Sequence, residues 1–583
     1  MTDPLIDSEI DPTTVGRSGE TETRWKTDYE RLVARFGDQA PERAIAPATD
    51  SGLPIKACYF PNDVAHIPFE EIGAPGFYPF TRGNLPAHYQ LMQWANQPVI
   101  GYGLPEQTRA RMDLLAEKGM VGYFGQRFYN LVYDLVSHEG LDPDHPAARG
   151  RIGQCGMAVY SVSDMERLFE GLDLTKMNVV HITYYQVIPA LAQYMAYAER
   201  RGVAKSDLRG NSMNWYHQSA YVGMSAFPPE QGLKLATELV SFCTKHMPRW
   251  NTTNFFCYGI EEAGGTAVQE IGLMLAFGIE LVEACRKAGL EPDSFLPRFG
   301  FQIAQANDFF EEIAKIRAFR RMWAKTMRER FGAEDPRSMH VRIHTHTSGA
   351  SLTARQPLVN LIRTTIHALG AALAGTQAME VSSYDEALSI PTEEAATLAL
   401  RVQQVIAEET NITAVADALG GSWYLESLTS QIEEAAIALA AKVEAQGGYI
   451  AAQRNGWIRA QVEKSADRWR QMVDSGKRRV VGLNCYRSEE EPEVPIFRVE
   501  PEVERVAVER IRALRAGRDA QRWAEAVRRF EQAAIAFAKK DVTDLANGEL
   551  MLAAIEAARA DATTGEMMGV LKQALGWGPP HEN

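Results

Sequence analysis

The sequence predicts an α/β protein built on a (β/α)8 TIM barrel, followed by a mainly helical C-terminal region. From about residue 95 to 400, short apolar segments alternate with longer amphipathic ones, as in "KMNVVHITYY" (176–185) followed by "VIPALAQYMAYAERRG" (187–202). This alternation is typical of a parallel sheet covered by helices. The number of alternations suits eight strands. Beyond residue 390, most segments instead have the periodicity of amphipathic helices.

These patterns divide the chain into three parts. Residues 1–54 are polar and are expected to form an N-terminal extension with one short helix. The barrel is assigned to residues 55–430, with functional residues expected at the C-terminal ends of its strands. Residues 431–583 are expected to be helical. Within them, the acidic, proline-containing stretch "SEEEPEVPIFRVEPEVE" (488–504) is expected to be a linker or a wrapping arm.

Composition excludes several classes of function. The chain has 583 residues, of which 45% are hydrophobic and 23% are charged, and its net charge is −14. An acidic chain of this kind is not expected to bind nucleic acid or an anionic membrane. The six cysteines form no CxxC pair, which fits a reducing cytoplasm. We expect neither a signal peptide nor a membrane span, and therefore a cytoplasmic protein.

The segment "RIHTHTSGASLT" (342–353) is unusual for a barrel strand. Its two histidines, His344 and His346, are two residues apart and therefore lie on one face of a strand. Most such barrels fill their interior with branched apolar side chains, so this strand suits a barrel that admits a polar molecule along its axis. A metal site usually needs a third ligand, and no neighbouring pattern supplies one, so we expect no metal. Structural, hydrogen-bonded histidines remain an alternative, more so for His344 than for His346.

Several further segments are informative when they are taken together. They are "GFYPFTRG" (76–83), "DFFEEIAKIRAFRRMWA" (308–324), "HTHTSGASLT" (344–353), "ALAGTQAMEVSSYDEALSIPTEEAATLALRVQQVIAEET" (372–410) and "VADALGGSWYLESLT" (415–429). With them the chain resembles, from about residue 55 onwards, the large subunit of coenzyme-B12-dependent acyl-CoA mutases. This is the family of methylmalonyl-, isobutyryl- and 2-hydroxyisobutyryl-CoA mutases.

The resemblance implies a radical isomerase. In this family an acyl-CoA ester threads through the barrel axis, and adenosylcobalamin on the C-terminal face supplies the radical chemistry for a carbon-skeleton rearrangement. The family's cobalt-ligating D-x-H-x-x-G motif does not occur here; the nearest string, "DPDHPAARG" (142–150), has different spacing. The resemblance therefore implies a separate cobalamin-binding small subunit, which residues 431–583 would contact. It also implies a heterotetramer and a GTPase chaperone as a further partner.

Several positions match the family's functional residues. Tyr258 matches the active-site tyrosine that guides cofactor and substrate radicals. The positions matched near cobalamin and its adenosyl group are Glu262, Glu386, Ala387 and Gly349. The positions matched on the acyl-CoA side are Asn251, Arg298, His344 and Gln377.

Other positions depart from the family pattern. Glycine stands at Gly259, where the family has a histidine that donates to the thioester carbonyl. The family's carbonyl-binding glutamine falls near Met213, and its carboxylate-binding arginine falls near Gly223. The remaining departures are His346 for a glutamine, Ala350 for a tryptophan, Gln97 for an arginine, Val99 at a substrate-discriminating position, and "YQLMQW" (89–94) for a run with CoA-binding arginines.

These departures lead to a hypothesis about the substrate. Without a cation near Gly223, a second carboxylate would be buried unpaired, so we expect an acyl-CoA that lacks one. Gly259 and Ala350 are expected to leave room for a larger or differently placed acyl group, and His346 is expected to replace the lost carbonyl donor. Trp215, Tyr216 and His217, in "NWYHQ" (214–218), are expected either to shape a new pocket or to pack between helices. Two alternatives remain open, namely a non-catalytic partner subunit and a B12-dependent mutase for a non-CoA substrate.

Overall fold

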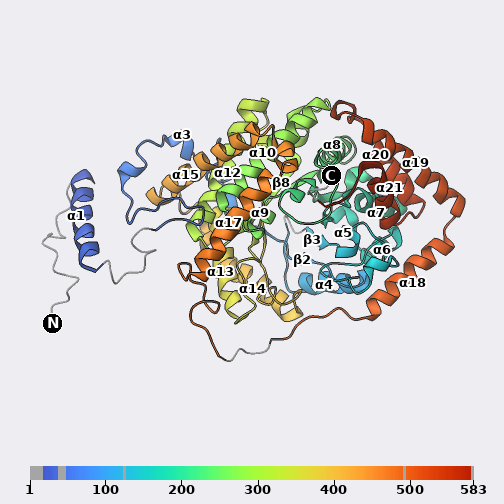
Figure 1. Ribbon diagram of the computed structural model, residues 1–583, viewed down its shortest axis with the longest axis horizontal. Coiled ribbons are helices and arrows are strands. Elements are labelled where there is room, and N and C mark those ends of the chain that lie inside the picture. The colour runs from blue at the N-terminus through green and yellow to red at the C-terminus, as the bar shows by residue number, and fades with distance from the viewer. Residues whose placement is uncertain (1–17, 37–46, 123–125, 490–493, 580–583) are drawn as a thin grey trace.

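A computed structural model describes residues 18–36, 47–122, 126–489 and 494–579. Its described core holds two parallel sheets of five strands each. Helices surround these strands (Figure 1). The strand order in the first is β2 (Val99–Ile100), β3 (Arg127–Val132), β4 (Met177–Ile182), β5 (Arg209–Ser212), β6 (Trp250–Asn251). The order in the second is β7 (Thr253–Phe256), β8 (Phe299–Gln305), β9 (Ile343–Thr347), β10 (Ala378–Glu380), β1 (Ala95–Asn96).

The two sheets adjoin at both of their edges. Gln97 and Pro98 alone separate β1 from β2, and Thr252 alone separates β6 from β7. The hydrogen bonding between β1 and β10 continues into Gln97, whose N–H donates to the carbonyl of Met379 on β10 at 2.9 Å. This α/β arrangement, with every pairing parallel, is consistent with a TIM-barrel-like domain of eight strands. The closure of the barrel stays a prediction.

Long helices alternate with the strands, as the amphipathic segments predict. The helices that follow successive strands are α4 (Pro105–Glu117), α6 (Val162–Leu168), α7 (Val187–Arg200), α8 (Pro229–His246), α10 (Ala267–Lys287), α12 (Phe309–Phe331), α13 (Val359–Ala374) and α14 (Glu393–Glu409). Helix-capping residues mark the start or the end of several of these helices. Thr266 and Gln269 form a capping box at the start of α10, and Gly332 ends α12 in the left-handed conformation at φ 69°.

The C-terminal region is helical and lies over the outside of the core (Figure 1). Its helices are α15 (Trp423–Ala445), α16 (Tyr449–Arg454), α17 (Trp457–Asp474), α18 (Glu502–Gly517), α19 (Ala520–Lys539), α20 (Glu549–Arg559) and α21 (Thr564–Leu575). Helix α15 packs against α10 and α12, whereas α20 packs against α7. The chain between α17 and α18 touches the core, since Phe497 lies edge-on to Tyr102 at 4.7 Å. Residues 490–493 of this expected arm lie outside the described residues.

At the other end of the chain, α1 (Ser18–Phe36) supplies the helix expected in the N-terminal extension. It contacts the body through Trp25, whose ring is 5.7 Å from that of Phe60. Residues 1–17 and 37–46 lie outside the described residues. The boundaries 1–54, 55–430 and 431–583 stay predictions. None of the helices in the described segments is both long and apolar enough to cross a membrane.

The string at 142–150 attaches the C-terminal helices to the core. The buried carboxylate of Asp142 pairs with Arg515 at 2.6 Å and accepts the backbone N–H of Gly565 at 2.8 Å. Thr563 donates its hydroxyl to the same carboxylate. Asp142 therefore has a structural role, because its contacts hold the start of α21 and helix α18 against the core.

Candidate active site

Strand register shows which side chains share a face with the two histidines. His344 pairs with Gln302 on β8, and His346 pairs with Ala304 on β8 and with Glu380 on β10. Paired residues of parallel strands point to the same face of a sheet. The opposite face packs against helices, as the Phe301 ring does on Trp323 at 4.8 Å. The histidines therefore lie on the face turned away from the helices.

The inward faces of the two sheets approach each other. The β5 residue Asn211 pairs with Asn251 on β6, and its Nδ2 atom lies 3.7 Å from the place that a Cβ on Gly300 of β8 would take. Arg342, next to β9, donates to Asn251 Oδ1 at 2.6 Å. Polar side chains of one sheet therefore face those of the other across a common interior.

This interior carries buried polar atoms that have no hydrogen-bond partner among the described residues. They are Asn130 Oδ1, Asn211 Oδ1, Asn254 Oδ1, Gln302 Oε1, both ring nitrogens of His344, and Glu380 Oε2. A buried polar group without a partner costs free energy, so such groups are normally satisfied by water or by a ligand. The arrangement therefore suits a long polar ligand that runs along the strands.

His346 and Tyr258 form a stacked pair where strands β7 and β9 end. Their ring centroids are 4.2 Å apart and their planes differ by 10°. The amide nitrogen of Gln302 lies 3.3 Å from His346 Nδ1, so this ring nitrogen accepts and Nε2 carries the proton. Burial, together with the neighbouring His344, lowers the pKa of His346 to about 3. His346 is thus a neutral imidazole with an N–H donor available at Nε2.

Three acidic or phenolic groups surround Gly349, just beyond β9. A Cβ on Gly349 would lie 2.7 Å from Glu386 Oε1, 3.2 Å from Glu262 Oε2 and 3.5 Å from the Tyr258 hydroxyl. Glu262 is held by the backbone N–H of Ala350 at 3.0 Å and by the hydroxyl of Ser348 at 2.9 Å. Burial raises the pKa of Glu386 to about 7 and also raises that of Glu262. The structure thus brings together the residues matched to the cofactor side, with Ala387 exposed beside them.

Aromatic rings line the neighbouring strand ends. Trp215 stacks on Phe256 with centroids 3.8 Å apart, and Tyr184 lies edge-on to Trp215 at 5.0 Å. A Cβ on Gly259 would lie only 2.2 Å from Cε1 of Phe256. The expectation that Gly259 leaves room for a larger acyl group is therefore wrong, because the Phe256 ring takes that space. The sequence could not show this, since Phe256 comes from the preceding strand.

The other expected positions have varied surroundings. Met213 is buried just after β5, and Val99 is half-buried and pairs with Asn130. Ala350 is exposed. Gln377 has both ends of its amide engaged by backbone, since it accepts from Ile343 N at 2.8 Å and donates to Gly375 O at 3.1 Å.

The N-terminal ends of the strands carry a cationic cluster. Arg209 begins β5, while Arg298 and Arg342 directly precede β8 and β9. Burial lowers the pKa of Arg298, and the positive charges of Arg342, Arg337 and Arg209 lower it further. A small cavity of about 160 Å³ lies beside Arg298 and Arg337. This end of the interior is thus arranged for an anion, whereas the Tyr258 end is acidic.

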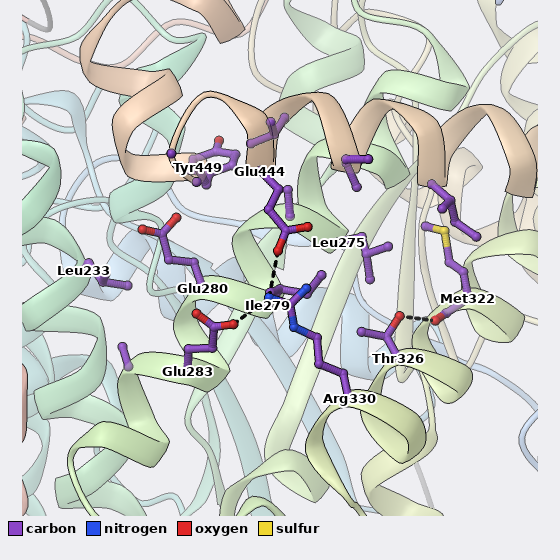
Figure 2. A pocket seen from close by; sticks show the side chains of 18 of the residues that line it. Leu233, Leu275, Ile279, Glu280, Glu283, Met322, Thr326, Arg330, Glu444 and Tyr449 are labelled. Atoms are coloured by element: carbon purple, nitrogen blue, oxygen red, sulfur yellow. Dashed lines mark hydrogen bonds and ion pairs between the residues drawn. The ribbon is translucent and has the colours of Figure 1, made fainter.

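A cavity of about 630 Å³ lies elsewhere, between α10, α12 and α15 (Figure 2). Arg330 crosses it to Glu283 at 2.7 Å and to Glu444 at 2.9 Å. None of the expected site residues lines this cavity. Among the described residues, no group of three or more His, Cys, Asp or Glu side chains could hold a metal ion.

Comparisons with known proteins agree with this geometry. The family model described as Methylmalonyl-CoA mutase matches residues 48–577. The 2-hydroxyisobutanoyl-CoA mutase large subunit of Aquincola tertiaricarbonis is 35% identical over 558 residues, which cover 94% of this chain and 96% of the relative. The methylmalonyl-CoA mutase of Rhizobium meliloti (strain 1021) is 35% identical, with 94% of this chain and 75% of the relative covered. The corresponding enzyme of Escherichia coli (strain K12) is 34% identical, with 91% and 72% covered.

Proposed function

Because the chain belongs to the methylmalonyl-CoA mutase family, whose members are isomerases, we propose that it is the large, substrate-binding subunit of an adenosylcobalamin-dependent mutase. The reaction is a carbon-skeleton rearrangement of an acyl-CoA without a second carboxylate. The observation that carries this proposal is the polar interior, which is cationic at one end and has the Tyr258 cluster at the other. We also propose that the two sheets close into one barrel around this interior.

The cationic end accounts for the phosphates of a CoA ester. The expected arginines at 89–94 and at Gln97 are missing, but Arg298 is held half-buried among other cations. Clustered positive charges favour a multiply charged anion such as CoA. The thioester would then lie near His346, whose Nε2–H can donate to its carbonyl.

Replacement of Arg298 by alanine is expected to weaken binding of a CoA ester about tenfold, since charge-assisted hydrogen bonds contribute about 1.5–3 kcal/mol. The difference should shrink as salt is added, because ions screen the interaction. Equilibrium binding at two ionic strengths measures this effect. Arg454→Ala, on the exposed side of α16, is the matched control. Equal affinities for the Arg298 variant and the parent would contradict the assignment.

The residues around Gly349 fit the cofactor side. Gly349 has no side chain, and polar atoms of Glu262, Glu386 and Tyr258, three groups that can hydrogen-bond, converge closely on it. Adenosylcobalamin, when bound, supplies the radical that initiates the rearrangement. In this proposal Tyr258 orients the reacting groups, Glu262 and Glu386 hold polar groups of the cofactor, and the aromatic rings exclude water.

Replacement of Gly349 by alanine is expected to reduce adenosylcobalamin affinity about tenfold in the assembled enzyme, because overpacking costs about 1–3 kcal/mol and would displace Glu386. Absorbance titration with the cofactor measures this affinity independently of turnover. Gly569→Ala, where nothing lies within 4 Å of the new Cβ, is the control. An unchanged affinity would remove Gly349 from the cofactor site.

A small subunit is part of the proposal. The name of the Aquincola relative contains "large subunit", which implies a smaller partner. We propose that this partner carries cobalamin and contacts residues 431–583, that the assembly is a heterotetramer, and that a GTPase chaperone serves it.

The deciding experiment is electron paramagnetic resonance on the chain reconstituted with its cobalamin subunit and adenosylcobalamin. Acyl-CoA esters and the matching free acids are added in turn. A coupled cob(II)alamin–organic radical signal with a CoA ester supports the proposal. A signal with free acids alone would replace CoA esters as the substrate class. Silence across the panel, with cofactor bound, would favour the non-catalytic partner subunit.

A further inference from the structure

Glu380 is a buried carboxyl group that the proposed function does not yet use. It is the last residue of β10, so it lies at the same end of the interior as Tyr258. Its register partner on β9 is His346, and the two side chains therefore share the inward face. Glu380 is 7% exposed, and its Oε2 atom has no hydrogen-bond partner among the described residues.

The surroundings of Glu380 favour its neutral form. Burial raises the pKa of Glu380 well above its usual value, and the negative charge of Glu386 raises it further. The backbone N–H of Val99 opposes this shift without reversing it. No cation of the described chain acts on Glu380 or on Glu386. A carboxylic acid in this state offers one O–H donor together with acceptor capacity.

These properties restrict what the acyl group can carry. A second carboxylate on the substrate would lie among Glu380, Glu386 and Glu262 without a neighbouring cation, so it is disfavoured. A purely hydrocarbon acyl group would leave Glu380 Oε2 buried and unpaired. A hydroxyl group is uncharged and both donates and accepts, so it satisfies the acid. The Phe256 and Tyr258 rings provide apolar surface for the rest of the acyl group.

We propose that Glu380 is a specificity-determining residue that holds a hydroxyl group on the acyl portion of the substrate, so that the substrate class is a hydroxyacyl-CoA ester. This inference rests on the proposed function and narrows it. Glu380 on β10 would bind the substrate hydroxyl, and His346 on β9 would bind the thioester carbonyl. Val99, whose backbone N–H contacts Glu380, would bound the same pocket.

The test compares two thioesters with the same carbon skeleton, 2-hydroxyisobutanoyl-CoA and isobutyryl-CoA. Their dissociation constants are measured by equilibrium binding to the full chain, which requires no turnover. The parent is expected to bind the hydroxylated ester about 10- to 100-fold more tightly, as the cost of an unsatisfied buried group implies. Glu380→Leu is expected to bring this ratio to within about threefold, because no polar group remains to be satisfied.

Two further variants separate recognition from folding. Glu380→Gln keeps a donor and an acceptor, so it is expected to retain most of the discrimination that Glu380→Leu loses. Glu394→Gln, at an exposed position in the first turn of α14, is expected to leave both affinities unchanged. Because the readout is a ratio of two affinities in one protein, general damage to the fold does not produce the expected pattern.

The possible failures are distinguishable. Equal binding of the two esters by the parent, or equal weakening of both by Glu380→Leu, would overturn the role of Glu380 and leave the mutase proposal intact. Tighter binding of methylmalonyl-CoA than of the hydroxylated ester would overturn the assigned substrate class. If the parent binds no CoA ester at all, the proposed function fails, and this inference fails with it.

Discussion

Replacement of His346 by alanine is expected to lower turnover about 10²- to 10³-fold, the usual effect of removing one donor from a developing oxyanion. The reason is that Gln302 engages Nδ1, so the neutral imidazole carries its proton on Nε2 and can donate from there. Adenosylcobalamin affinity should change little, since Glu262, Glu386 and Gly349 are untouched. Steady-state kinetics and cofactor titration on the same samples measure the two effects.

The pH dependence gives a second check on His346. Since burial places its pKa near 3, the ring is uncharged throughout pH 5–8 and its donor capacity does not change. Turnover should therefore show no titration step from His346 in this range. His346→Gln, which restores the family's residue and a donor, is expected to recover part of the activity that alanine loses. Undiminished turnover in His346→Ala would remove the residue from the reaction.

Replacement of Lys315 by methionine is expected to destabilise the protein by about 3–5 kcal/mol, because it would leave buried carboxylates without their cation. Lys315 Nζ lies 2.5 Å from Glu270 and 2.5 Å from Glu312, and it donates to the carbonyl of Ala304 at 2.9 Å. Burial opposes its charge, but the two glutamates outweigh that effect and raise the pKa of Lys315. Urea denaturation followed by circular dichroism measures the loss.

The matched control is Lys464→Met, which makes the same change at an exposed position of α17. Exposed substitutions usually change stability by no more than about 0.5 kcal/mol. The loss of Lys315 should also disturb the candidate active site. The N–H of Ala304 donates to Glu270 at 2.8 Å, and Ala304 is the register partner of His346. Equal unfolding midpoints for the two variants would show that the buried cluster does not support β8.

Much of this architecture can be predicted from the sequence, because its periodicities directly report burial. The alternation of apolar and amphipathic segments predicts parallel strands followed by helices, and both are present. The motif segments also identify Tyr258, Glu262, Gly349 and Glu386, which the structure brings together. These residues are identified through the family resemblance that the motif segments carry, and each of them follows the end of a strand.

Other features depend on contacts between distant segments. Glu380 is the one polar residue of "AME", and Gln302 is one of two glutamines in "FGFQIAQ". Only strand register relates them to His346. Arg209, Arg298 and Arg342 are scattered along the chain and converge because parallel strands begin at the same edge. The filled space beside Gly259 depends on the orientation of one ring, which no spacing encodes.

The polar interior has a consequence for how this fold can diversify. Stability resides largely on the outward faces of the strands, where residues such as Phe301 and Trp323 pack against helices. The inward faces carry polar atoms that have no hydrogen-bond partner among the described residues, and these groups contribute little to the packed core. An inward substitution can therefore change what is bound without a large folding penalty. Such a division lets selection test new substrates one residue at a time while the scaffold stays intact.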